Sequence, residues 1–218
     1  MQLSVSTFSL RMTEFIVVFI GIPLCLWLTK GYFAPYLLPI LSCLGVGCAW
    51  LLYIDGKLAK QWRRAKNINW PQLKPVILTF LLFALFISLY VWLVSEQLSL
   101  NTPLLLSSGW LLILVLYPLF SVIPQEIIYR TFLFHRYKLL FPSKKVRVLV
   151  SSLSFGFGHV IYGSLLVVLL SIIAGFLFSY RYFSSGNTAI VIIEHSLWGL
   201  FLFAFNIGAL FSLSQSVI

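Results

Sequence analysis

The sequence predicts an all-α protein, a bundle of transmembrane helices, and three observations lead to this class. Of the 218 residues, 61% are hydrophobic and 9% are charged. The mean hydropathy is +1.02, and one soluble core of this size could not enclose so much apolar surface. Apolar stretches of about 20 residues, enough to cross about 30 Å of hydrocarbon, recur along almost the whole chain. We therefore expect residues 1–218 to form a single integral membrane domain.

Seven apolar segments are predicted to cross the membrane as helices. They are residues 12–29, 33–54, 75–94, 104–137, 147–161, 164–183 and 188–213. The first is interpreted as a retained helix rather than a signal peptide, because it lacks a small-residue cleavage site and a second span follows closely. The last is expected to be one tilted helix or two pieces joined near Gly199 or Gly208.

The fourth segment is too long for one straight crossing, since it would extend about 51 Å as a helix. Pro124 is the expected place for a break. Proline lacks a backbone donor and clashes with the preceding turn, but it is favoured in the first turn of a helix. A new helix is therefore predicted to begin at Gln125, which gives a bundle of seven or eight helices.

The basic residues gather in short loops between the predicted spans, a pattern that indicates orientation. With the N-terminus in the cytoplasm, thirteen Lys and Arg residues lie on the cytoplasmic side, Lys30 lies on the other, and Arg130 lies within a span. The net charge of +10 is then a matter of topology, and no nucleic-acid partner is expected. The expected location is the inner (plasma) membrane of a bacterium.

Five ionisable side chains lie deep inside the predicted spans: Glu126, Arg130, His159, Glu194 and His195. Such residues cost about 2.5 to 3.5 kcal/mol each to insert, so they usually face the protein interior and mark function. From the helical rise, Glu126, His159 and His195 lie about 15, 18 and 12 Å from the cytoplasmic ends of their segments. Three helices thus bring polar groups to a similar depth, which indicates one site.

A structural role is the alternative for each cluster. Glu126 and Arg130 are four residues apart and share a helix face, which suits an ion pair that only neutralises two buried charges. His159 follows Gly156 and Gly158, which would let another helix or a substrate backbone approach that histidine. Glu194 and His195 are adjacent and cannot share a helix face, so only one of these two is expected to point into the site.

In these clusters the chain resembles the CAAX protease and bacteriocin-processing (CPBP or Abi) family of polytopic intramembrane endopeptidases. That family shows Glu-Glu-x-x-x-Arg, then Phe-x-x-x-His, then His-x-x-x-Asn or Asp, on successive helices. The chain has Gln125-Glu126-Ile-Ile-Tyr129-Arg130, then Phe155-Gly-Phe-Gly-His159, then His195-Ser-Leu-Trp-Gly199. The resemblance covers about residues 115–213 and implies a peptide hydrolase that works on a membrane-bound or hydrophobic peptide among membrane lipids.

Two positions depart from the family pattern. The first glutamate, to which the family assigns activation of water, is Gln125 here, and the last Asn or Asp is Gly199. An amide cannot accept the proton, so three interpretations are open. Glu126 or Glu194 serves as the base, or the glutamine is an engineered inactivating change, or the chain is a pseudoenzyme that binds without cutting. The carboxylate of Glu194 beside the histidine of the third motif favours the first.

The resemblance implies hydrolysis of a peptide bond of a membrane-associated protein, or of a hydrophobic or lipidated peptide, near the cytoplasmic face. The expected catalytic residues are Glu126, Glu194, His159, His195 and Gln125, and the expected supporting residues are Arg130, Tyr129 and Phe155. A carboxylate would activate water, the histidines would polarise the carbonyl and stabilise the oxyanion, and Gln125 would donate to the oxyanion or position water. The alternatives are an inactive peptide-binding, lipid-binding or bacteriocin-immunity protein and a small proton-relay transporter. The absence of two related halves disfavours the transporter.

A zinc ion is the only cofactor that the motifs suggest. His159, His195 and Glu126 together would provide two nitrogen ligands and one oxygen ligand for Zn²⁺. The chain lacks the close spacing of two histidines on one helix that soluble zinc proteases show. The sequence thus leaves a zinc mechanism and a metal-free mechanism both open.

Overall fold

The computed structural model describes residues 5–94 and 107–204, which form helices joined by short turns and loops, with no strand among them. This confirms the predicted class. The N-terminal half comprises α1 (Val5–Ile16), η1 (Val17–Gly21), α2 (Ile22–Leu28), α3 (Lys30–Phe33), η2 (Ala34–Tyr36), α4 (Leu37–Ile54), α5 (Lys57–Lys66) and α6 (Trp70–Val94). The C-terminal half comprises α8 (Ser108–Tyr117), η3 (Pro118–Val122), α9 (Ile123–Glu126), η4 (Ile127–Phe132), α10 (Leu133–Arg136), α11 (Lys144–Gly158), η5 (His159–Tyr162), α12 (Leu165–Ser185) and α13 (Thr188–Ala204).

Five described segments are long and apolar enough to cross a membrane, in line with an integral membrane protein. They are Thr7–Leu28, Lys30–Ile54, Trp70–Tyr90, Ser108–Arg136 and Leu165–Ser185, and Thr188–Ala204 is a shorter apolar helix. The predicted span 147–161 corresponds to α11 and η5. α13 continues through Gly199, so of the alternatives for the last segment the joint near Gly199 is excluded. The predicted joint at Gly208 and residues 104–106 lie outside the described residues.

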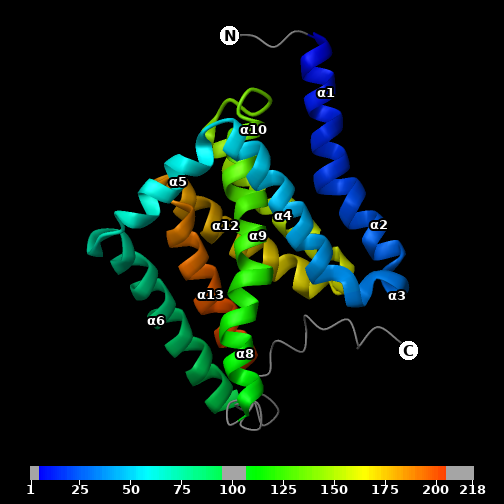
Figure 1. Ribbon diagram of the computed structural model, residues 1–218. Helices are drawn as coiled ribbons and strands as arrows, with labels where there is room; N and C mark the ends of the chain where they lie inside the picture. The colour runs from blue at the N-terminus through cyan, green and yellow to red at the C-terminus, as the bar shows by residue number, and fades with distance from the viewer. Residues whose placement is uncertain (1–4, 95–106, 205–218) are drawn as a thin grey trace.

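The rod formed by α8, η3, α9, η4 and α10 stands in the middle of the bundle (Figure 1). It is one helical segment of 29 residues, Ser108–Arg136, so the helix predicted to begin at Gln125 does not begin there. Instead the π-helical turns η3 and η4 flank α9, and the wider π turn gives the ring of Pro124 room. The carbonyl of Phe120, which loses its usual partner at Pro124, accepts a hydrogen bond of 3.4 Å from Ser42 Oγ on α4.

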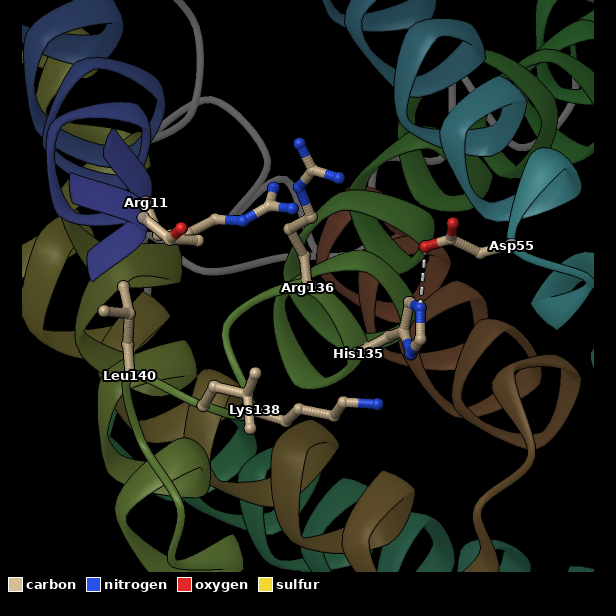
Figure 2. A pocket seen from close by; sticks show the side chains of 8 residues that line it. Arg11, Asp55, His135, Arg136, Lys138 and Leu140 are labelled. Carbon is tan, nitrogen blue, oxygen red and sulfur yellow. Dashed lines mark hydrogen bonds and ion pairs between the residues drawn. The ribbon is translucent and has the colours of Figure 1, made fainter. Parts of the chain in front are cut away.

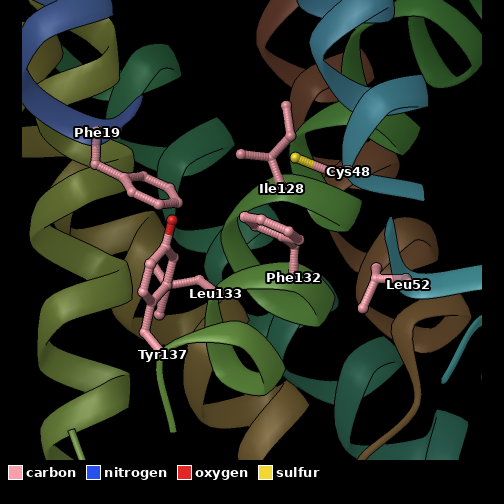
Figure 3. Close-up of a cluster of buried hydrophobic side chains, with 7 residues drawn as sticks. All are labelled: Phe19, Cys48, Leu52, Ile128, Phe132, Leu133 and Tyr137. Carbon is pink, nitrogen blue, oxygen red and sulfur yellow. The ribbon is translucent and has the colours of Figure 1, made fainter. Parts of the chain in front are cut away.

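Aromatic and aliphatic side chains fasten the central rod to the N-terminal helices (Figure 3). The buried members of this cluster are Phe19, Cys48, Leu52, Ile128, Phe132, Leu133 and Tyr137. They come from η1, α4, η4 and α10 and from the residue after α10. Cys48 is a free, buried thiol that packs in this cluster as a small apolar side chain.

Polar contacts gather where α10 ends. Glu14 accepts hydrogen bonds from Arg136 at 2.9 and 3.0 Å and from the Tyr137 hydroxyl at 3.0 Å. Burial and the nearby Glu14 carboxylate raise the pKa of Tyr137, so its hydroxyl keeps the proton that it donates. His135 pairs with Asp55 at 2.9 Å across the same end. The first helix and the loop after α4 are thus both tied to the end of the central rod.

Small residues let α11 and α12 pack closely. A Cβ atom on Gly156 would overlap Ile172, and one on Gly175 would lie 3.0 Å from the Cα atom of Ser152. Ser179 Oγ donates to Ser151 Oγ at 2.9 Å across the same contact. Glycine and serine side chains at such a crossing let two membrane helices approach each other. This contact fixes the end of α11, where the first histidine of the site lies.

Candidate active site

Glu126 and His195 meet in the interior of the bundle. Glu126 lies in α9 and is fully buried, and His195 lies in α13 with 7% of its surface exposed. The distance between Glu126 Oε1 and His195 Nδ1 is 2.7 Å. A carboxylate accepts, so Nδ1 of the ring carries the hydrogen and Nε2 is the acceptor atom of the neutral ring. The convergence of these two helices, expected from their depths, is present in the structure.

Arg130 closes the other side of Glu126. Its Nε lies 3.2 Å from Glu126 Oε2, and both side chains are fully buried. The guanidinium carbon lies 4.4 Å from the centre of the Phe155 ring and 5.4 Å from that of Phe178. Cation–π contacts of this kind are stronger when they are shielded from water. The carboxylate of Glu126 is thus held between a fixed cation and an imidazole.

His159 follows α11 and begins η5. Its Nδ1 lies 2.7 Å from the carbonyl oxygen of Phe155, which can only accept, so this ring also carries its hydrogen on Nδ1. The Phe155 ring packs against both histidines, with ring centres 4.7 Å from His159 and 5.6 Å from His195. The ring of Phe178 stacks on His195 at 4.6 Å. Aromatic rings therefore fix the orientation of both imidazoles.

Gln125 points away from the Glu126 pair. Its Nε2 donates to Ser121 Oγ at 2.9 Å, one turn earlier on the same rod. Its Oε1 is buried and, among the described residues, makes no hydrogen bond. The amide is thus anchored through its donor, and its acceptor atom faces the interior.

Glu194 does not join this group, although it is fully buried. Its two oxygens accept from Nε and Nη2 of Arg181, each at 2.9 Å. Thr79 of α6 lies 3.5 Å from one of the same oxygens. The side chain of Glu194 therefore ties α13 to α12 and α6, on a different face of the helix from His195. Arg181, expected to be one of the topogenic charges, is the partner of this carboxylate.

Two tyrosines of the central rod lie against glycines of the predicted motifs. A Cβ atom on Gly158 would overlap the hydroxyl of Tyr129, and one on Gly199 would overlap the hydroxyl of Tyr117. The ring centre of Tyr117 lies 6.4 Å from that of His195. Tyr129 lies within the first motif and was predicted, whereas Tyr117 has no counterpart in the three motifs and was not. In the sequence, only the glycine at position 199, which leaves space for a bulky side chain, indicated such a neighbour.

The described residues do not fit a zinc site. No group of three or more His, Cys, Asp or Glu side chains among them could hold a metal ion. Both oxygens of Glu126 are engaged, one by Nδ1 of His195 and the other by Arg130, so this carboxylate is not free to bind a metal ion. The predicted ligand set of His159, His195 and Glu126 is therefore not assembled around a common point.

A cavity of about 320 Å³ lies at the end of the central rod rather than at the histidines (Figure 2). Its polar walls are Arg11, Asp55, His135, Arg136 and Lys138. The figure shows the imidazole of His135 turned toward Asp55, with Arg11 and Arg136 on the opposite side. These are the contacts that close the end of α10.

The part of the chain that carries the three motifs is similar to a known protein family. Residues 106–201 match the family model of type II CAAX prenyl endopeptidases, Rce1-like. This match agrees with the resemblance that the three motifs indicate. The Rce1-like segment contains all the residues of the three motifs, from Gln125 to Gly199. Searches of curated proteins and of solved structures found no match.

Proposed function

We propose that the protein is an intramembrane endopeptidase of the CAAX type. It hydrolyses a peptide bond of a membrane-associated protein, or of a hydrophobic or lipidated peptide, near one face of the membrane. The Rce1-like match supports a peptide hydrolase in general. The observation that carries the proposal is the buried contact of 2.7 Å between Glu126 and His195, which is a carboxylate–imidazole pair set among apolar rings. Ionisable residues inside membrane spans usually mark a functional site.

Both histidines present Nε2 as an acceptor atom in their neutral form, because Nδ1 of each donates to a fixed oxygen. We assign proton abstraction from water to His195, since the carboxylate of Glu126 stabilises the imidazolium that forms. The water oxygen attacks the carbonyl carbon of the peptide, and Nε2 of His195 takes the water proton. The same proton then passes to the leaving amine as the carbon–nitrogen bond breaks.

In this proposal Glu126 orients and stabilises His195, Arg130 holds Glu126, and His159 positions water or the carbonyl. The engagement of both Glu194 oxygens by Arg181 favours Glu126 over Glu194 as the carboxylate of the reaction. Gln125 needs no proton in this scheme, so its amide is compatible with activity. Its side chain is bonded to Ser121 and points away from the Glu126–His195 pair, so no proton transfer is assigned to it.

The test is cleavage of a panel of lipidated and unmodified membrane peptides by the reconstituted protein. Glu126→Gln and His195→Gln are expected to lower the rate by at least about 100-fold, the usual range for an acid–base group. Glu194→Gln is the matched control, because it makes the same change at an equally buried carboxylate that also pairs with an arginine. Equal losses in Glu126→Gln and Glu194→Gln would contradict the assignment.

Two further results separate the alternatives. If neither the natural chain nor any variant cuts any peptide, a binding or immunity protein replaces the protease. If Gln125→Glu alone creates activity, the glutamine is an inactivating residue. Binding of the same peptides by His195→Gln shows whether substrate recognition survives the loss of chemistry.

We also propose that the end of the bundle carrying α5, α10 and the turn after α12 faces the cytoplasm of a bacterium. Two contacts support the view that these elements lie at the same end of the bundle. Asp55 pairs with His135, and Arg64 donates to the carbonyl of Gly186. Lys30 lies at the other end, where its Nζ would be 3.5 Å from a Cβ atom on Gly163. Labelling of single cysteines at Lys145 and Gly163 with an impermeant reagent tests this orientation. The opposite accessibility would reverse it.

A further inference from the structure

A second cavity lies away from the histidines, between α5 and the turn that joins α12 to α13. Its volume is about 630 Å³. Three cations line it, Lys60, Arg63 and Arg64, together with neutral polar side chains that include Asn67 and Asn187. Its described lining contains no Asp or Glu, so nothing in that lining neutralises the three positive charges.

The walls of this cavity are fixed by hydrogen bonds across the two elements. Arg64 donates to the carbonyl of Gly186, and Asn187 Nδ2 donates back to the carbonyl of Arg64 at 2.9 Å. Gln61 Oε1 accepts from the backbone N–H of Thr188 at 3.2 Å, at the start of α13. Gly186 has a φ of +62°, and a Cβ atom there would overlap the Arg64 guanidinium. The cavity is therefore built by the fold rather than by mobile surface chains.

The two remaining cations are available to a ligand. In the described part of the chain, no ion pair includes Lys60 or Arg63. Both side chains are exposed, whereas Arg64 is held against the turn. Arg64 thus shapes the cavity, and Lys60 and Arg63 supply unpaired donors at its mouth.

The place of α5 in the chain puts this cavity at the membrane surface. α5 joins α4 to α6, and both of these belong to segments that could cross the membrane (Figure 1). Two tryptophans flank the cations, Trp62 with 66% and Trp70 with 62% of their surface exposed. Tryptophan is favoured at the level of lipid headgroups, and cations just outside a span are drawn to anionic lipids.

From these observations we infer that the cavity binds the phosphate headgroup of an anionic phospholipid. The phosphodiester accepts from Lys60 and Arg63 and from the amide of Asn67, while the acyl chains lie beside Trp62. Free phosphate shares the headgroup chemistry but has no chains to bury. The lipid lies against the turn that begins α13, the helix of His195, so binding stabilises that turn. The inference is independent of the proposed protease activity.

The test uses the purified full chain in a neutral detergent. Dioleoyl phosphatidylglycerol, dioleoyl phosphatidylcholine and inorganic phosphate are titrated separately, with retained adducts measured by native mass spectrometry and the unfolding midpoint by a thermal scan. Lys60→Gln/Arg63→Gln is compared with Lys144→Gln/Lys145→Gln, which removes the same charge from exposed positions at the start of α11. Arg64 stays unchanged because it holds the turn.

We expect phosphatidylglycerol to bind and to raise the unfolding midpoint, with little effect of phosphatidylcholine. Each basic residue near an anionic lipid strengthens binding about fivefold, so the α5 double variant loses about 30-fold and Arg63→Gln alone about fivefold. The α11 variant keeps its affinity. Equal losses in the two double variants, equal binding of the two lipids, or an equal effect of inorganic phosphate would each overturn the inference.

Discussion

The hydroxyl of Tyr117 lies against Gly199, one helical turn after His195, and leaves no room for a Cβ atom at that glycine. The side chain that the family pattern places here is therefore replaced by a group from the central rod. Tyr117 contacts the same face of α13 as His195, and its ring meets the imidazole edge-on.

Gly199→Ala is expected to destabilise the protein by about 1 to 3 kcal/mol, because the added methyl group overpacks the contact with Tyr117. Thermal unfolding in detergent measures this loss. The double variant Gly199→Ala/Tyr117→Leu is expected to recover part of it, since the shorter side chain makes space. Additive losses in the double variant would show that the two residues do not interact.

Arg130→Met is expected to cost about 3 to 5 kcal/mol, because it leaves the buried carboxylate of Glu126 without its cation. The double variant Arg130→Met/Glu126→Gln removes both charges and is expected to recover most of this stability, although it stays inactive. Denaturant unfolding of the four proteins gives the coupling energy. A double variant as unstable as the sum of its parents would show that the pair is not a unit.

Gly175→Ala is expected to weaken the contact between α11 and α12, because its Cβ atom would lie 3.0 Å from backbone atoms of Ser152. The end of α11 carries Phe155 and leads directly into His159, so we expect the rate of peptide cleavage to fall together with stability. Gly47→Ala in α4 is the matched control, since nothing lies within 4 Å of a Cβ atom there. That change should leave stability equal or raise it by up to about 1 kcal/mol.

The protein purified without chelator is expected to contain no stoichiometric zinc, and its cleavage rate is expected to be unchanged by chelators. The described residues offer no group of three ligands, and both oxygens of Glu126 are engaged by His195 and Arg130. Elemental analysis measures the metal content directly. One zinc per chain, lost in His159→Ala, would contradict the metal-free mechanism.

Much of the fold could be predicted because the bilayer restricts a chain to few solutions. Long apolar segments must become helices there, and the described parts of all seven predicted segments are helical. The break at Pro124 was wrong for a local reason. A proline ends a helix when its ring clashes with the preceding turn and the carbonyl that loses its donor finds no other partner. Here the π turns make room for the ring, and Ser42 donates to the carbonyl of Phe120. A single sequence does not show which neighbouring helix brings such a hydroxyl.

The candidate site was predicted in part. The depth of Glu126 and of His195 in the membrane could be calculated because the helical rise is regular. Their similar depths predicted that the two residues converge. Rotation of each helix about its axis was not predictable in the same way, so the Glu194–Arg181 pair and the Tyr117 contact appear only in the structure. α5 was missed as a helix, because its basic composition was interpreted as a topogenic loop.

The hydrogen bonds of Glu14 with Arg136 and Tyr137 limit where the chain can be truncated. The family match starts at residue 106, yet the hydrogen bonds of Glu14 and the aromatic cluster around Phe19 join residues on both sides of that boundary. A chain cut at residue 106 would leave Arg136 without its carboxylate and Ile128 and Phe132 without their apolar cover. The segment that matches the family model is thus shorter than the segment that must be expressed for the protein to fold.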